Sequence, residues 1–110
     1  MGTIEQRRHP RVIVDFYADW GWGPEYEFYD RITSLSISGC FLATRRDLTP
    51  GDEIFIRWTG ERVGMISLKG AVRNLLRVTE ETAPVGAGIE FVGTSAQNEQ
   101  RLQALLSQFG

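Results

Sequence analysis

The stretch Val85-Gly-Ala-Gly-Ile-Glu-Phe-Val92 alternates apolar residues with small or polar ones, and Gly93 ends the alternation. A period of two is typical of a β-strand that buries one face. The next residues, Thr94-Ser-Ala-Gln97, fit a capping box, and apolar residues then recur at the spacing of one helical face: Leu102, Leu105, Leu106 and Phe109. We therefore predict a strand followed by a C-terminal helix over about residues 95–109, with this face packed on the sheet or on a partner.

Five further β-type runs precede this strand, and turn residues separate them. Pro50-Gly51 indicates a type II turn, and Asp19-Trp-Gly-Trp-Gly-Pro24 is expected to form a hairpin tip. An irregularity is expected at Gly70, inside the longest run. Short antiparallel strands favour a small barrel or sandwich, and we prefer the barrel, with the helix covering one open end, because closure removes exposed strand edges. With 85–92, about six strands are predicted, the others covering 11–17, 26–36, 40–44, 53–58 and 65–78.

Composition indicates one globular domain. The chain has 110 residues, of which 42% are hydrophobic and 24% are charged. Cys40 and His9 are the only residues of their types, so neither an internal disulfide nor a Cys/His zinc site is possible. The sequence contains no apolar run of about 18 residues and no signal-peptide pattern. We therefore expect a cytoplasmic protein in a reducing compartment, without membrane insertion.

The charge pattern limits the classes of partner. The net charge of −2 argues against binding to DNA or RNA, and it also disfavours a single-strand binder that would use exposed aromatic residues. We find no nucleophile elbow, phosphate loop or paired metal ligands, so we do not expect an enzyme. Lys69 is the only lysine among 12 basic residues, and the other 11 are arginines, which suit forked hydrogen bonds and stacking on flat rings.

Two short motifs stand out by their order along the chain. Arg7-Arg-His-Pro-Arg11 contains Arg-x-x-x-Arg in a mobile arm before the first strand, with His9 as a spacer. Ser34-Leu-Ser-Ile-Ser-Gly39 contains Ser-x-x-Gly where the next hairpin ends. Both patterns recur in reverse order within one strand, at Ser67–Gly70 and Arg73–Arg77, and we attribute those copies to chance.

This order of motifs resembles the PilZ domain, in which Arg-x-x-x-Arg precedes the first strand and Asp/Asn-x-Ser-x-x-Gly follows it. Three more segments resemble the family, namely Gly39–Thr44, Leu48–Asp52 and Gly86–Val92. The resemblance implies a mainly β fold, a six-stranded antiparallel barrel with a C-terminal α-helix. It also implies a flexible arginine-bearing arm over 1–10, a barrel domain over 11–110, and a receptor for the bacterial second messenger cyclic di-GMP.

The resemblance also assigns ligand-binding residues. Arg7 and Arg11 match the two motif arginines, Arg8 is an auxiliary cation, and Ser34, Ser36 and Gly39 match the second motif. The chemistry agrees, because an arginine fork matches guanine O6 and N7 or a phosphate, and its flat face stacks on a base. Gly39 would allow a tight bend and a close approach of the ligand.

Two functions follow from these residues. The first is a single-domain adaptor that binds cyclic di-GMP as a regulatory ligand, uses no other cofactor, and relays the ligand level to an effector protein. The second is a PilZ-like protein-interaction module without the ligand, because Ser34 stands where the family usually has Asp or Asn. Trp20 and Trp22 either fold back onto the barrel or form the surface that contacts a partner protein. Trp58 is expected in the core.

Overall fold

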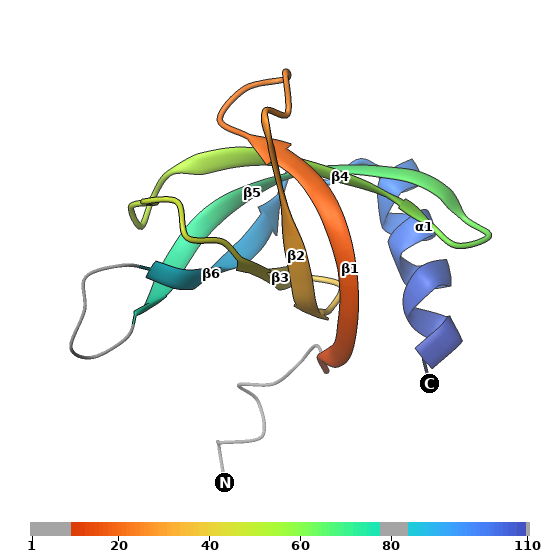
Figure 1. The fold of residues 1–110 in the computed structure, drawn as a ribbon. Coiled ribbons are helices and arrows are strands. Elements are labelled where there is room, and N and C mark those ends of the chain that lie inside the picture. Colours follow the sequence, from red (N-terminus) through yellow and green to blue (C-terminus); the bar gives the residue numbers. More distant parts are fainter. Residues whose placement is uncertain (1–9, 78–83, 110) are drawn as a thin grey trace, which may run out of the picture.

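Six antiparallel strands form a closed barrel in a computed structural model that describes residues 10–77 and 84–109 (Figure 1). The order around the barrel is β1-β2-β3-β6-β5-β4, and β4 pairs with β1 to close the ring. The predicted fold class is therefore confirmed. The strands are β1 (Val12–Gly21), β2 (Phe28–Leu35), β3 (Gly39–Ala43), β4 (Glu53–Gly60), β5 (Gly64–Arg77) and β6 (Pro84–Val92).

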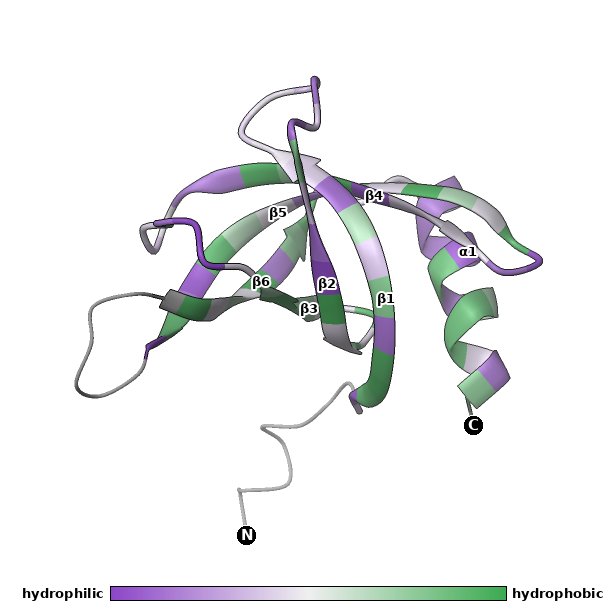
Figure 2. Cartoon of the chain, in the orientation of Figure 1, coloured by the Kyte–Doolittle hydropathy of each residue, from purple (hydrophilic) through white to green (hydrophobic). Residues whose placement is uncertain are grey.

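Alternation along the strands fills the barrel. In β4, Ile54, Ile56 and Trp58 are buried, while the residues between them are partly or largely exposed. Figure 2 shows the same alternation of hydrophobic and hydrophilic bands along β1. The expectation that Trp58 belongs to the core is confirmed, since 5% of its surface is exposed. Burial of one strand face against the opposite wall is the main source of stability in a barrel of this size.

The chain ends in α1 (Ala96–Leu106) and the short 3-10 helix η2 (Ser107–Phe109). The N-cap is Ser95 rather than the expected Thr94, and its hydroxyl accepts from the backbone N–H of Asn98. The side chain of Asn98 in turn accepts from the backbone N–H of Ser67 at 3.1 Å, so a cap at Ser95 ties the helix to β5. No helix among the described residues is long and apolar enough to cross a membrane.

The helix packs on β4 and β5 through part of the expected face. Leu102 and Leu105 are buried, and Leu106 lies partly buried against the core. Phe109 differs from the expectation, because 48% of its surface is exposed. The chain turns into the tighter 3-10 helix at Ser107, which moves Phe109 off the line of the α-helical face.

The tip of the β1–β2 hairpin is shorter than expected. β1 continues to Gly21, with Trp20 paired to Phe28 of β2 and to Ile56 of β4. Trp20 is completely buried, and its indole N–H donates to Asp30 Oδ2 at 2.9 Å. Trp20 is therefore excluded from the expected partner surface, because cross-strand pairing turns it inward. Trp22 lies beyond the strand and remains 45% exposed.

The irregularity expected at Gly70 is found elsewhere in β5. Gly70 pairs regularly with Ile54 and Phe91, and its missing side chain makes room for Ile89, whose Cγ2 would lie 2.3 Å from an added Cβ. The register of β5 against β6 shifts instead between Val72 and Asn74. Gly70 thus serves the packing of Ile89, and the bulge in β5 lies at Arg73.

Gly39 allows β3 and β6 to approach closely. A Cβ built on Gly39 would lie 2.3 Å from the carbonyl oxygen of Ile89. Because this oxygen belongs to the backbone of the paired strand, it cannot move aside as a flexible side chain could. Gly39 is therefore required for strand packing, independently of any ligand.

Trp20→Ala is expected to destabilise the protein by about 3–5 kcal/mol, because it empties a fully enclosed site in the barrel. Trp22→Ala is the control, with an expected loss of about 1–2 kcal/mol, because this half-exposed side chain packs edge-on against Trp20 and Phe28. Chemical denaturation of both variants measures the difference. Equal losses would contradict the burial of Trp20.

Gly39→Ala is expected to lower the free energy of unfolding by about 1–3 kcal/mol, because the methyl group meets the Ile89 carbonyl. Gly23→Ala is the control, since its nearest neighbour would be Glu25 Oε1 at 3.4 Å. Thermal denaturation compares the two. A Gly39→Ala protein as stable as the control would show that β3 and β6 can move apart slightly without loss of stability.

Candidate functional site

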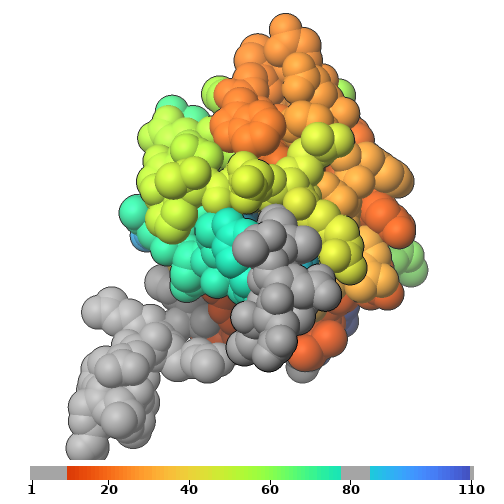
Figure 3. Space-filling view, turned by 60° about the vertical axis from the view of Figure 1, so that its left-hand side comes forward, coloured from red at the N-terminus to blue at the C-terminus, as the bar shows by residue number. Residues whose placement is uncertain are grey.

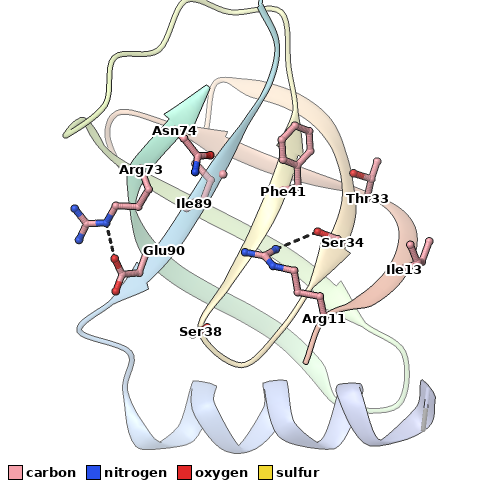
Figure 4. A pocket seen from close by; sticks show the side chains of 11 residues that line it. Arg11, Ile13, Thr33, Ser34, Ser38, Phe41, Arg73, Asn74, Ile89 and Glu90 are labelled. Carbon is pink, nitrogen blue, oxygen red and sulfur yellow. Dashed lines mark hydrogen bonds and ion pairs between the residues drawn. The ribbon is translucent and has the colours of Figure 1, made fainter. Parts of the chain in front are cut away.

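An open cleft of about 710 Å³ lies on the outside of the barrel, beside the β2–β3 turn (Figure 4). Arg11, which directly precedes β1, and Ile13 of β1 form one side, and Arg73 of β5 and Glu90 of β6 form the other. Its volume lies within the range of small-molecule sites in proteins. We find no group of three or more His, Cys, Asp or Glu that could hold a metal ion within 10–77 and 84–109.

Strand irregularities bring consecutive residues to this cleft. The β2–β3 register shifts between Ile32 and Ser34, and both Thr33 and Ser34 line the cleft. In a regular strand two neighbours would point to opposite faces. The β5–β6 shift has the same effect on Arg73 and Asn74. The two bulges therefore bring polar side chains to the cleft from both of its sides.

Arg11 and Ser34 meet across one side of the cleft. Arg11 Nη1 donates a hydrogen bond to Ser34 Oγ at 3.1 Å, and this pair is exposed. The two predicted residues are 23 positions apart in the chain, and the pairing of β1 with β2 brings them together. The remaining N–H groups of a guanidinium can still serve a phosphate or a base edge.

Ser36 and Gly39 hold the turn beneath the cleft and do not line it. Ser36 is 1% exposed, and its Oγ accepts from the backbone N–H of Ser38 at 3.2 Å. The backbone N–H of Ser36 donates to the carbonyl of Gly39 at 2.8 Å. Ser38, which the motif spacing leaves unassigned, is the turn residue that faces the cleft. Within the second motif, Ser36 and Gly39 thus hold the turn, while Ser34 and Ser38 line the cleft.

The far side of the cleft contains an ion pair that the sequence analysis missed. Arg73 Nε donates to Glu90 Oε1, and about half of each side chain is exposed, 55% and 51%. Figure 4 shows this pair and the Arg11–Ser34 pair on opposite sides of the cleft. Arg73 belongs to the arginine pattern that was attributed to chance, and only a signal for the bulge beside it could have identified it.

Two glycines of β6 leave room for the side chains that form part of the cleft wall. A Cβ on Gly86 would lie 2.4 Å from the Phe41 ring, and one on Gly88 would lie 2.4 Å from Asn74 Oδ1. The Phe41 ring and the Asn74 amide therefore rest directly over the β6 backbone. They add a flat apolar surface and a hydrogen-bonding group to the cleft.

Cys40 lies inside the barrel behind the cleft. Burial raises the pKa of its thiol to about 12, and the nearby charge of Arg11 opposes this rise. The thiol is therefore protonated and inert at neutral pH. Arg7, Arg8 and the expected arm over 1–10 lie outside the described residues, apart from Pro10.

Comparison with known proteins agrees with this geometry. The family model described as PilZ domain matches residues 5–108, a range that contains both motifs. No curated protein matches the chain.

Similar solved structures include the PilZ domain of YcgR from Escherichia coli with c-di-GMP, at TM-score 0.72 and 16% identity over 94% of this chain and 91% of that one. The inhibitor of motility MotI/DgrA of Bacillus subtilis has TM-score 0.73 and 16% identity over 94% of this chain and 50% of its own. The MrkH–c-di-GMP complex of K. pneumonia has TM-score 0.72 and 18% identity over 93% and 51%. The chain thus spans about half the length of MotI and MrkH.

The barrel order, the terminal helix and a family match over nearly the whole sequence lead to one conclusion: the chain belongs to the PilZ domain family.

Proposed function

We propose that this protein is a receptor for cyclic di-GMP that acts as a regulatory binding module and not as a catalyst. The observation that carries the proposal is the cleft in which Arg11, from the first motif, contacts Ser34, from the second. The YcgR and MrkH structures that it resembles contain c-di-GMP, which supports the same ligand here.

The cleft offers groups that suit each part of this ligand. Arg11 can bind a phosphodiester or the O6 and N7 atoms of guanine, and the Phe41 ring can support a base. Arg7 and Arg8, which precede the first strand, would add positive charge from the arm. Ligand binding would then order the arm and change the surface that a partner protein recognises.

The partner would be an effector protein, and Trp22 is the aromatic side chain that we assign to that contact. Trp22 is 45% exposed at the tip of the β1–β2 hairpin, which projects beyond the rest of the face seen in Figure 3. Exposed tryptophans often anchor protein interfaces. In the proposed adaptor, this hairpin tip would transmit the ligand-bound state of the cleft to the effector protein.

The second candidate is a protein-interaction module that does not bind cyclic di-GMP. The observation that favours it is Ser34, since a hydroxyl offers a guanine edge a weaker acceptor than a carboxylate or an amide. Loss of one such charge-assisted bond costs about 1.5–3 kcal/mol, or roughly 10- to 150-fold in affinity. The hairpin tip would serve as the docking surface in this case as well.

Calorimetric titration of cyclic di-GMP into the protein tests the receptor. We expect saturable binding that Arg11→Ala weakens by tenfold or more, roughly the effect of a lost charge-assisted hydrogen bond. Arg57→Ala is the control, because Arg57 is also a solvent-exposed arginine with a side-chain partner, Asp19, but does not line the cleft. GMP serves as the competitor for specificity. No heat and no thermal shift at ligand concentrations of hundreds of micromolar would refute the receptor.

Ser34→Asp is expected to bind cyclic di-GMP roughly 10- to 150-fold more tightly than the wild-type protein, because a carboxylate accepts more strongly from a guanine edge. The same titration measures the gain. Absence of binding in both forms would favour the interaction module.

A further inference from the structure

The cleft contains one carboxylate among the described residues that line it, that of Glu90. Its neighbours across the two paired strands are Gly39 and Ala71, which are small and leave the side chain accessible. Glu90 Oε1 accepts from Arg73, and Oε2 has no hydrogen-bond partner within the described part of the chain. An acceptor is therefore available at the side of the cleft opposite Ser34.

Arg73 presents a matching donor. Glu90 occupies the Nε side of its guanidinium, and no hydrogen bond engages either Nη nitrogen among residues 10–77 and 84–109. The β5 bulge directs both Arg73 and Asn74 to the cleft, so the fork lies beside the carboxylate on the same wall. Figure 4 shows the Arg73 guanidinium and the Glu90 carboxylate in direct contact.

The edge of guanine carries acceptors and then donors, which matches a wall where the Arg73 donor fork lies beside the Glu90 carboxylate. N7 and O6 accept hydrogen bonds and suit an arginine fork, while the adjacent N1–H and N2–H₂ groups donate and suit a carboxylate. Adenine has an amino group in place of O6 and an acceptor at N1, so it would set a donor against Arg73 and an acceptor against Glu90. An Arg–Glu pair therefore distinguishes the two purines.

We propose that Arg73 and Glu90 form a guanine-reading pair that gives this cleft its base specificity and supplies the carboxylate that Ser34 lacks. This inference rests on the proposed function, because it concerns the base of the same cyclic dinucleotide. Arg11 would hold a phosphodiester, and the Arg73–Glu90 pair would select the base. The pair is exposed and weak in water, so rearranging it around a ligand costs little.

Titrations with cyclic di-GMP and cyclic di-AMP test this pair, because the two ligands share the phosphodiester ring and differ in the base. The wild-type protein is expected to prefer cyclic di-GMP. Glu90→Gln and Arg73→Lys are expected to reduce that preference roughly 10- to 100-fold, mainly through weaker binding of cyclic di-GMP. Arg11→Ala is expected to weaken the binding of both ligands by a similar factor.

Glu53→Gln is the matched control. Glu53 pairs with Lys69 at 3.5 Å, is also about half exposed, and lies outside the cleft, so its loss should leave the preference unchanged. Circular dichroism and thermal melting check that each variant is folded, and Arg73→Lys retains the charge beside Glu90 if Glu90→Gln is unstable.

The outcomes separate the two proposals. A wild-type protein that binds neither cyclic dinucleotide refutes the receptor, and the guanine-reading pair with it. Binding of cyclic di-GMP with a preference that Glu90→Gln and Arg73→Lys leave unchanged overturns the pair alone. Equal binding of both dinucleotides by the wild-type protein, or equal losses for both in the variants, also overturns it.

Discussion

Closure of the barrel depends on a short seam between β1 and β4. Three residue pairs form this seam, Asp19 with Arg57, Trp20 with Ile56 and Gly21 with Phe55, whereas β4 and β5 pair along eight positions. Without the seam β1 and β4 would be exposed sheet edges. The buried Trp20 lies at its centre, so a single large side chain fills the barrel where the two edges meet.

The cleft is a consequence of the way these strands bend to close. Strands of a small barrel must coil strongly, and bulges provide the extra twist. Two of the register shifts turn Thr33–Ser34 and Arg73–Asn74 toward the same cleft. A regular barrel of this sequence would divide each pair between core and solvent. The bulges that accompany barrel closure therefore also place these polar side chains in the cleft.

The charged groups of the cleft are held by exposed bonds. Arg11 and Arg73 stand on opposite sides, bonded to Ser34 and Glu90, and both bonds are exposed to solvent. Such bonds contribute about 1 kcal/mol or less to folding, so a ligand can replace them at little cost. Ser36 and Gly39 belong to a different layer, where buried hydrogen bonds and close strand contact hold the turn. Within the six residues of the second motif, Ser34 and Ser38 thus line the cleft, while Ser36 and Gly39 hold the turn.

The sequence alone determined the local structure. Alternation in 53–58 and 85–92, the leucine spacing of the helix and the order of the two motifs predicted the strands, the terminal helix and the PilZ barrel, because these patterns depend on neighbours in the chain. Tertiary structure alone decided the rest. It buried Trp20, made Gly39 a packing residue and brought Arg73 to Glu90 in the cleft. The physical reason is that register shifts depend on how strands far apart in sequence pair with one another, so no local pattern predicts which side chains they turn outward.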